Sequence, residues 1–298
     1  MARARAQRRL TGPPLTGPWA LAPALVVLGL LLAAGFGYAV AQSLGALPLT
    51  GNRALGLQAY RDVLAGESGS GDLWASAAFT LWVSAAATIA AGLVALAAVA
   101  WLERPRRRGG LATGLLHINL AIPHVVWAVA LLLLLSQSGI VARAAAAIGL
   151  LDDPSGFPIV VRDRYGIGII LDYASKEAPF LALVGLALVR AQPRELGLMA
   201  DTLGARGLRR LRLLILPTVL PGMAAASALV FAFVFGAYEA PVVLGVSSPR
   251  VLSILGLDLF NSADLTNRPA AMALGVLMTL AVTVVIWTAV AIAGRQRS

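Results

Sequence analysis

The sequence predicts an all-α protein, a polytopic membrane bundle of six transmembrane helices with a short cytoplasmic helix between spans four and five. The first reason is composition, because 59% of the 298 residues are hydrophobic and 13% are charged, whereas soluble domains carry about 25% charged residues. The second is that the apolar residues fall into runs of roughly twenty, the length with which a helix crosses a hydrocarbon core of ~30 Å. The third is the uneven placement of arginine beside these runs.

Six runs have a suitable length, over residues 21–41, 75–101, 117–135, 166–189, 222–244 and 270–293. The first follows a basic stretch and ends at Ala39-Val40-Ala41, which resembles a signal peptide with its cleavage site. Its apolar part exceeds the roughly 7–15 residues of such peptides, so we expect it to be retained as a span. The fourth run is the weakest, because Asp172, Lys176 and Glu177 interrupt it.

Arginines predict the orientation of the bundle. Sixteen of them flank one set of alternate run ends and seven flank the other set. Because cytoplasmic loops carry the excess of Lys and Arg, we expect both termini in the cytoplasm. The predicted order is a basic cytoplasmic tail over residues 1–20, a transmembrane domain over 21–293 and a cytoplasmic tail over 294–298. The dominance of arginine and alanine is typical of a GC-rich bacterial genome. We expect the chain to be a multi-pass protein of the bacterial cytoplasmic (inner) membrane.

The residues offer no enzymatic chemistry. A phosphate-binding loop needs Gly-Lys followed by Ser or Thr, but the chain's only lysine, Lys176, lies between Ser175 and Glu177. His117 and His124 are seven residues apart, which does not fit a metalloprotease helix, and we expect them to pack or form hydrogen bonds. With no cysteine, disulfides and thiolate metal sites are excluded. The net charge of +10 lies at the ends of the apolar runs, which argues against a nucleic-acid-binding face.

The loop over residues 190–217, here called the coupling segment, is the most informative part of the chain. Pro193 and Glu195 suit the first turn of a helix over residues 195–203, which Gly204 would close. Leucines and arginines at helical spacing then predict a second, basic amphipathic helix that leads into span five. From the residues alone, this unit either projects from the bilayer as a contact surface for a soluble partner or lies on anionic lipid.

The coupling segment resembles the cytoplasmic signature loop of the permease subunits of type I ATP-binding-cassette (ABC) importers. In that loop, Glu-Ala-Ala is followed after three residues by Gly, and nine residues later by Ile-x-Leu-Pro. Here Ala200 matches the second alanine and Gly204 the glycine, while Leu216 and Pro217 match the closing pair. Pro179 and Phe180 also resemble the family's habitual lead-in to this loop, and the run over residues 235–245 is similar to span five in the polyamine, iron and thiamine branches.

Three positions depart from the family pattern. Leu198 stands in place of the glutamate, Met199 in place of the first alanine and Leu214 in place of isoleucine. Asp201, nearly one turn after Leu198, either substitutes for the glutamate or is an exposed acidic residue. The resemblance implies an ATPase-coupling site made of Glu195, Leu198, Ala200, Asp201, Gly204, Ala205, Leu216 and Pro217.

The resemblance also implies a function and a set of partners. This chain would form the translocation path for a small solute, polyamine-like or otherwise cationic, and would bind no cofactor itself. ATP would be bound by two copies of an ABC ATPase subunit. A second permease subunit, identical or different, and an extracytoplasmic substrate-binding protein would complete the importer in the lipid bilayer, without nucleic acid.

Charged residues inside a span usually face a cavity, a protein interior or a partner charge. Asp172 and Lys176 are spaced as an i,i+4 pair, and we expect them to neutralise each other. Glu177 has no partner at helical spacing. Glu239 lies ~26 Å along a continuous helix from Gly222 at ~1.5 Å per residue, which predicts a position near the external mouth. We expect Glu177 and Glu239 to line a path for cationic cargo. The alternative is a secondary transporter or channel that ATP does not drive.

Overall fold

The computed structural model describes residues 21–46, 55–66, 73–102, 110–205 and 207–295, and within these residues the chain forms helices and no strand. The predicted tail over residues 1–20 and the last residues, 296–298, lie outside the described part of the chain. The predicted all-α class is confirmed.

Five stretches are long and apolar enough to cross a membrane. They include the helices α1 (Ala22–Ser43), α3 (Leu73–Leu102), α10 (Leu216–Gly236) and α13 (Arg268–Arg295), and a stretch over residues 124–147. Helix α7 (Ile167–Arg190) has 24 residues and so has spanning length, but it carries the three charged side chains that weakened the fourth predicted span. Predicted and observed bounds of spans one, two, four and six agree within two residues.

Two predicted spans are interrupted. The third, expected to be one helix over residues 117–135, consists of α4 (Gly110–Ala121) and α5 (His124–Leu135). The fifth, expected over residues 222–244, is α10 followed by a separate short helix, α11 (Glu239–Leu244). Both predictions of a continuous helix were wrong. In each run the residues stay apolar through a position where the backbone leaves the helical conformation, so hydrophobicity alone did not show the break.

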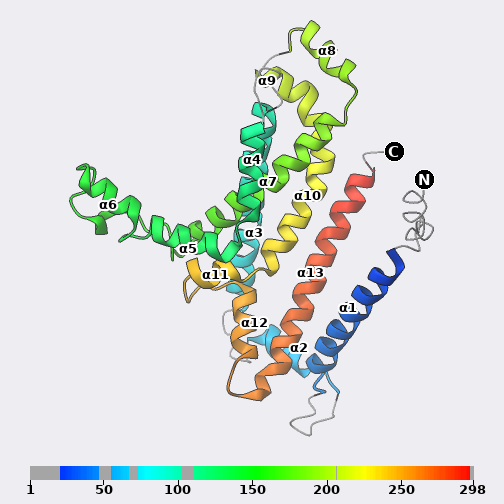
Figure 1. Ribbon diagram of the computed structural model, residues 1–298. Helices are drawn as coiled ribbons and strands as arrows, with labels where there is room; N and C mark the ends of the chain where they lie inside the picture. Colours follow the sequence, from blue (N-terminus) through cyan, green and yellow to red (C-terminus); the bar gives the residue numbers. More distant parts are fainter. Residues whose placement is uncertain (1–20, 47–54, 67–72, 103–109, 206, 296–298) are drawn as a thin grey trace, which may run out of the picture.

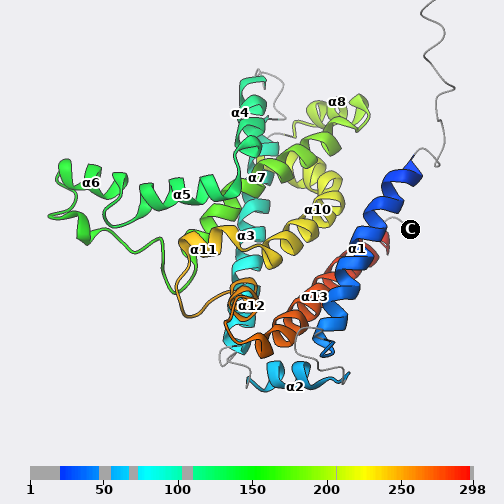
Figure 2. The same ribbon diagram turned by 60° about the horizontal axis from the view of Figure 1, so that its bottom comes forward.

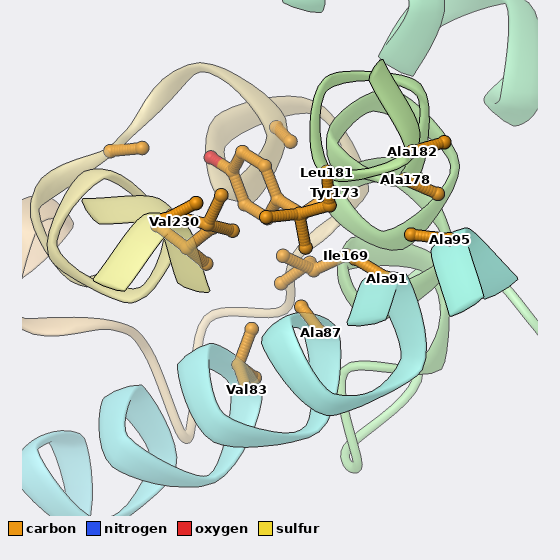
Figure 3. Packing of buried hydrophobic residues seen from close by; sticks show 14 of the residues in the cluster. Val83, Ala87, Ala91, Ala95, Ile169, Tyr173, Ala178, Leu181, Ala182 and Val230 are labelled. Carbon is orange, nitrogen blue, oxygen red and sulfur yellow. The ribbon is translucent and has the colours of Figure 1, made fainter. Parts of the chain in front are cut away.

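The helices pack around two hydrophobic clusters. The larger lies between α3, α7 and α10, where Val83, Ala87 and Ala91 of α3 face Ile169 and Tyr173 of α7 (Figure 3). The second lies between α12 (Leu252–Phe260), α13 and α2 (Gln58–Ala65). Helix α7 is the centre of the larger cluster, since it packs against α3, α10, α4, α5 and α11.

Glycines allow the helices of the larger cluster to approach closely. A Cβ at Gly185 of α7 would lie 2.7 Å from Val99 Cγ2 of α3. A Cβ at Gly222 of α10 would lie 2.6 Å from Leu188 Cδ1 of α7. Small residues at such contacts let helix backbones approach each other, as is common in membrane bundles.

The two ends of the bundle carry different elements (Figures 1 and 2). At one end lie α8 (Arg194–Thr202) and α9 (Gly207–Arg210), and at the other lies α2, with α12 leading towards that end. Between the ends, α5 and α6 (Ile140–Ala147) extend sideways from the bundle, and α11 lies beside the start of α5.

Candidate functional site

Two breaks in the helices lie against the same part of α7. Pro123 starts α5 with extended backbone, at φ −60° and ψ 144°, because proline has no N–H to continue α4 and disfavours helical backbone in the residue before it. Ala237 ends α10 with φ −74° and ψ 148°. Helices α5 and α11, which follow the two breaks, contact each other and α7. Irregular backbone at membrane depth is tolerated where protein or a water-filled cavity surrounds it.

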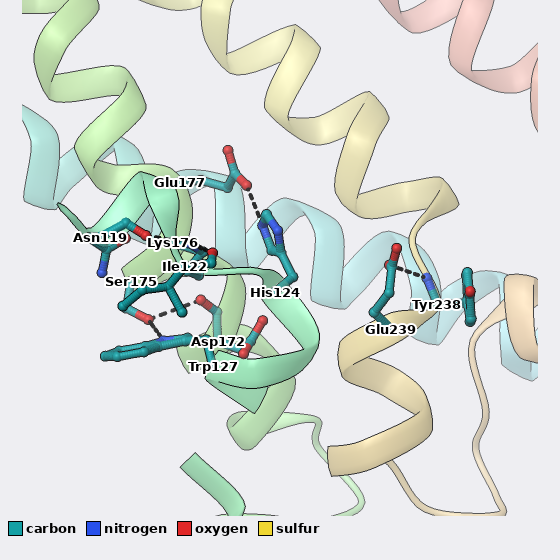
Figure 4. Close-up of polar contacts among 10 residues, drawn as sticks. All are labelled: Asn119, Ile122, His124, Trp127, Asp172, Ser175, Lys176, Glu177, Tyr238 and Glu239. Atoms are coloured by element: carbon teal, nitrogen blue, oxygen red, sulfur yellow. Dashed lines mark hydrogen bonds and ion pairs between the residues drawn. The ribbon is translucent and has the colours of Figure 1, made fainter. Parts of the chain in front are cut away.

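Three consecutive residues of α7 bind the turn between α4 and α5 (Figure 4). We call this turn, residues 122–123, the elbow. Ser175 Oγ accepts a hydrogen bond of 2.8 Å from Trp127 Nε1. Lys176 Nζ donates to the carbonyl oxygens of Asn119, at 2.5 Å, and Ile122, at 2.6 Å.

The third contact of the elbow is between Glu177 and His124, whose Oε1 and Nε2 atoms are 3.0 Å apart. The His124 ring also lies 5.1 Å from the ring of Phe233 on α10. Glu177 therefore has a partner on another helix, which its spacing within α7 did not reveal. His124 forms a hydrogen bond, as expected, but its role beside Glu177 was missed.

The expected pairing of Asp172 with Lys176 is wrong. Lys176 is 1% exposed and directs its ammonium group at the two carbonyl oxygens. Asp172 is fully buried, and neither of its carboxylate oxygens has a hydrogen-bond partner among the described residues. Pro123 lacks the N–H that the Asn119 carbonyl would otherwise bind in a continuous helix. That carbonyl accepts a 3.3 Å hydrogen bond from the N–H of Ile122 instead, and takes the lysine as a second donor.

Glu239 is half-buried at the first residue of α11, where its Oε2 accepts a 3.3 Å hydrogen bond from the backbone N–H of Tyr238. Because α10 ends at Gly236, the helical rise does not carry Glu239 to the outer end of the bundle. Helix α11 lies between the two ends and beside α5 (Figures 1 and 4). The predicted position near the external mouth is therefore wrong, and Glu239 lies in the same region as His124 and Glu177.

This region is rich in carboxylates. Asp172, Glu177 and Glu239 lie there with one lysine and one histidine. Within the part of the chain that the structure describes, no group of acidic, histidine or cysteine side chains could hold a metal ion. The arrangement can bind or exclude charged solutes at the helix breaks.

The coupling segment folds as two helical pieces joined by a glycine turn. Helix α8 covers residues 194–202, close to the predicted 195–203, and Gly204 has a left-handed φ of +65°. The N–H of Ala205 donates to the carbonyl of Ala200 at 2.9 Å, and Ala205 is 4% exposed. The turn holds the end of α8, and glycine adopts its backbone without a steric penalty.

The predicted second helix of the coupling segment is present as α9 followed by a π-helical turn, η5 (Leu211–Ile215). This turn leads directly into α10, whose first two residues are Leu216 and Pro217. Proline suits this position, since the first turn of a helix needs no N–H donors.

Apolar side chains of α8 are exposed at this end of the molecule. Leu198 is 64% exposed, and Glu195 is exposed as well, while the side chain of Asp201 lies outside the described residues. Between α8 and the ends of α7 and α10 lies a cavity of about 280 Å³, with Leu196, Leu186 and Leu214 in its wall. Leu198 and Met199 are both exposed, so neither side chain packs into the core of the bundle.

Comparison with known sequences matches most of the chain to one family. The family model described as "Binding-protein-dependent transport system inner membrane component" matches residues 89–298. The inner membrane ABC transporter permease protein YnjC of Escherichia coli (strain K12) is 30% identical over 151 residues, which are 50% of this chain. The matched part is 27% of that protein, so the alignment spans about a quarter of its length.

Two solved structures share the fold. One is a bacterial ABC transporter involved in the import of the acidic polysaccharide alginate, with a TM-score of 0.69 and 16% identity. The match covers 93% of this chain and 97% of that chain. The other is a bacterial alginate ABC transporter in complex with a periplasmic protein bound to an alginate pentasaccharide, with a TM-score of 0.70, 17% identity and coverage of 90% and 92%.

Proposed function

Because the chain belongs to the family of binding-protein-dependent transport system inner membrane components, we propose that it is the permease subunit of an ABC importer, crossing the membrane six times. Both termini and the coupling segment then face the cytoplasm. The sixteen-to-seven distribution of arginines supports this orientation. The proposal makes α7 the fourth crossing, with its charged side chains turned towards the protein rather than lipid.

The observation that carries the proposal is the shape of the coupling segment. Helix α8 lies at one end of the bundle, joined by the turn at Gly204 to the piece that enters α10. Its exposed Leu198 and Met199 are apolar side chains that a soluble partner would cover. The coupling site would comprise Glu195, Leu198, Ala200, Asp201, Gly204, Ala205, Leu216 and Pro217, with an ATPase subunit seated on it.

The partners follow from this function. Two copies of an ABC ATPase bind and hydrolyse ATP, and this chain holds no cofactor. A second permease subunit, identical or different, completes the path, and an extracytoplasmic binding protein delivers the solute. One solved structure with this fold is a complex with a periplasmic protein that carries an alginate pentasaccharide, which supports a solute-carrying partner.

We propose a small cationic solute, polyamine-like in charge, as the cargo. The region at the helix breaks supports this choice, since three carboxylates lie there with one lysine and one histidine. Lys176 is committed to backbone carbonyls and Glu177 to His124. Among the described residues, the Glu239 carboxylate has only the N–H of Tyr238 as a hydrogen-bond partner, so it is the group best placed to meet a cation.

The test is copurification of the ATPase with the permease from membranes that contain the whole importer. The wild-type chain should retain the ATPase in stoichiometric amount. Leu198→Arg should lower the recovered ATPase by roughly tenfold, the effect of losing about 1.4 kcal/mol at an interface. Leu265→Arg is the matched control. Leu265 is also an exposed leucine, but it lies just before the first residue of α13, far along that helix from its C-terminal end.

Two results would contradict the proposal. One is the absence of any ATPase with the wild-type chain, and the other is equal recovery with both variants. The first result would favour a secondary transporter, the second candidate. The specific observation in its favour is the pair of interrupted helices with ionisable residues beside them, which is common in that class.

A further inference from the structure

The inference concerns how α5 is held in place. Ala128 is the only residue of α5 that is buried, and it has a small side chain. Other residues of α5, such as Val126 and Leu133, are exposed. Apolar packing holds the later part of α5 through Ala128 and the partly buried Leu131, Leu132 and Leu135. The start of α5 is held by its polar contacts with α7.

Those polar contacts come from one stretch of α7. Ser175 binds Trp127, Lys176 binds the carbonyls before the elbow, and Glu177 binds His124. Both sides of the elbow are thus tied to successive residues of one helix. The lysine has a further reason to lie there, because a cation is stabilised at the carbonyl end of a helix such as α4.

The same stretch of α7 is placed to move. Pro179 lies inside α7 and cannot donate to the carbonyl of Ser175, which weakens the helix at this turn. Beyond the proline, α7 runs to Arg190, roughly 21 Å from Lys176 at ~1.5 Å per residue. Only three residues, 191–193, separate the end of α7 from the start of α8. A displacement of α8 therefore reaches α7 directly through the chain.

We propose that Ser175, Lys176 and Glu177 form a clasp that transmits movement of α7 to α5, with Lys176 as its central positioning residue. The proposal rests on the proposed function, because the movement is the one that a partner ATPase would impose on α8. In this arrangement, α5 and its contact with α11 shift when the ATPase closes, and the region around Glu239 changes with them.

The experiment measures the position of α5 without knowledge of the solute. The chain has no cysteine, so spin labels can be attached to Leu133→Cys on α5 and Leu280→Cys on α13, both exposed in the structure. The distance between the labels is measured by pulsed dipolar spectroscopy in the complete importer in nanodiscs. It is compared without nucleotide and with ATP plus vanadate, while ATP hydrolysis is assayed on the same samples.

The parent pair should show a shift in distance on addition of ATP and vanadate. Lys176→Met removes the donors of the clasp but leaves Asp172 as a lone buried carboxylate, which is destabilising in itself. The decisive variant is therefore Asp172→Asn with Lys176→Met, which removes both charges. We expect it to hydrolyse ATP and to lose the shift. Lys176→Arg keeps a donor and should retain the shift, as should the volume-conserving control Leu181→Met on the same helix.

The clasp is overturned if the label-to-label distance shifts as much in the double variant as in the parent pair. It is also overturned if the parent pair shows no shift in that distance. If the double variant does not assemble, Ser175→Ala decides, since it removes the acceptor of Trp127 together with a hydrogen bond to the Asp172 carbonyl within α7 itself. It should reduce the shift, and a full shift would overturn the proposal. An importer that assembles without ATP hydrolysis refutes the proposed function instead, and the clasp with it.

Discussion

At the scale of single residues, the carboxylates beside the helix breaks differ in how they are partnered. Glu177 forms a 3.0 Å contact with His124, while Glu239 accepts one hydrogen bond from a neighbouring backbone N–H. A buried or half-buried charge with few partners interacts strongly with a charge that enters beside it. Removal of the charge of Glu239 should therefore weaken cation binding more than removal of the charge of Glu177.

This difference gives a prediction for cargo. Glu239→Gln should lower uptake of labelled putrescine or spermidine into proteoliposomes that hold the complete importer, by roughly tenfold, since one charge-assisted hydrogen bond is worth about 1.5–3 kcal/mol. Glu239→Asp keeps the charge and is the control. Glu177→Gln should have a smaller effect.

Two outcomes would contradict this prediction. Wild-type uptake of both amines by Glu177→Gln and Glu239→Gln would refute the role of these carboxylates in binding the cargo. No uptake of either amine by a wild-type importer whose ATPase is active would refute the cationic cargo.

The sequence predicted which charged residues belong to the candidate site, but not which groups they contact. Asp172, Lys176, Glu177 and Glu239 stood out because charges inside apolar runs are costly. Their partners did not, because the carbonyls of Asn119 and Ile122 become accessible to Lys176 only where the helix breaks before Pro123. The spacing of Asp172 and Lys176 predicted an ion pair, but the lysine binds these carbonyls instead.

At the scale of elements, α3, α7 and α10 depend on close helix contact. A Cβ at Gly185 would lie 2.7 Å from Val99 Cγ2, and Val99 is fully buried and β-branched, so it has little room to move. The methionine on the other side, Met223, is more adaptable, with its sulfur 3.2 Å from the same point. The contact between α7 and α3 is therefore the rigid one.

Gly185→Ala should lower the melting temperature of the purified chain in detergent by roughly 2–6 °C, because overpacking costs about 1–3 kcal/mol. The measurement is thermal unfolding followed by tryptophan fluorescence. Gly92→Ala on α3 is the matched control, since nothing lies within 4 Å of the added Cβ. It should leave the melting temperature unchanged or raise it, as alanine favours a helix over glycine by about 1 kcal/mol. Equal melting temperatures for the two variants would contradict close packing at Gly185.

Elements were predicted best where run length alone defines them. Helices α1, α3, α7 and α13 begin and end within two residues of the predicted bounds. The two helix breaks were missed because the apolar runs continue through them. The residues at the first break are Ile122 and Pro123, and those at the second are Ala237 and Tyr238. The signal for the first break was Pro123 itself, which sits in the middle of the predicted span.

At the scale of the whole molecule, the proposed six crossings would put the coupling segment and the turn before α13 on opposite sides of the membrane. A single cysteine can report this in a chain that has none. Leu265→Cys should react with a membrane-impermeant maleimide in spheroplasts, and Leu203→Cys only after the membrane is permeabilised. Both leucines are exposed in the structure, and labelling in detergent controls for reactivity. The reverse pattern would contradict cytoplasmic termini.

The family and the all-α membrane class were predictable from the sequence, and both are confirmed. Membership followed from local residues, because the spacing from Gly204 to Pro217 is read along the chain. The proposed path for the solute involves residues far apart in sequence, such as His124, Glu177 and Glu239. Their proximity depends on where the helices break and cross, which no local pattern encodes.

Helix α1 packs chiefly along α13, and this has a consequence for synthesis of the protein. More than two hundred residues separate the end of α1 at Ser43 from the start of α13 at Arg268. At about 5–20 residues per second, a ribosome needs roughly ten to forty seconds to make the intervening chain. During that interval α1 must reside in lipid without its partner. Its almost wholly apolar surface suits this wait, and α13 closes the bundle as the last helix to leave the ribosome among those the structure describes.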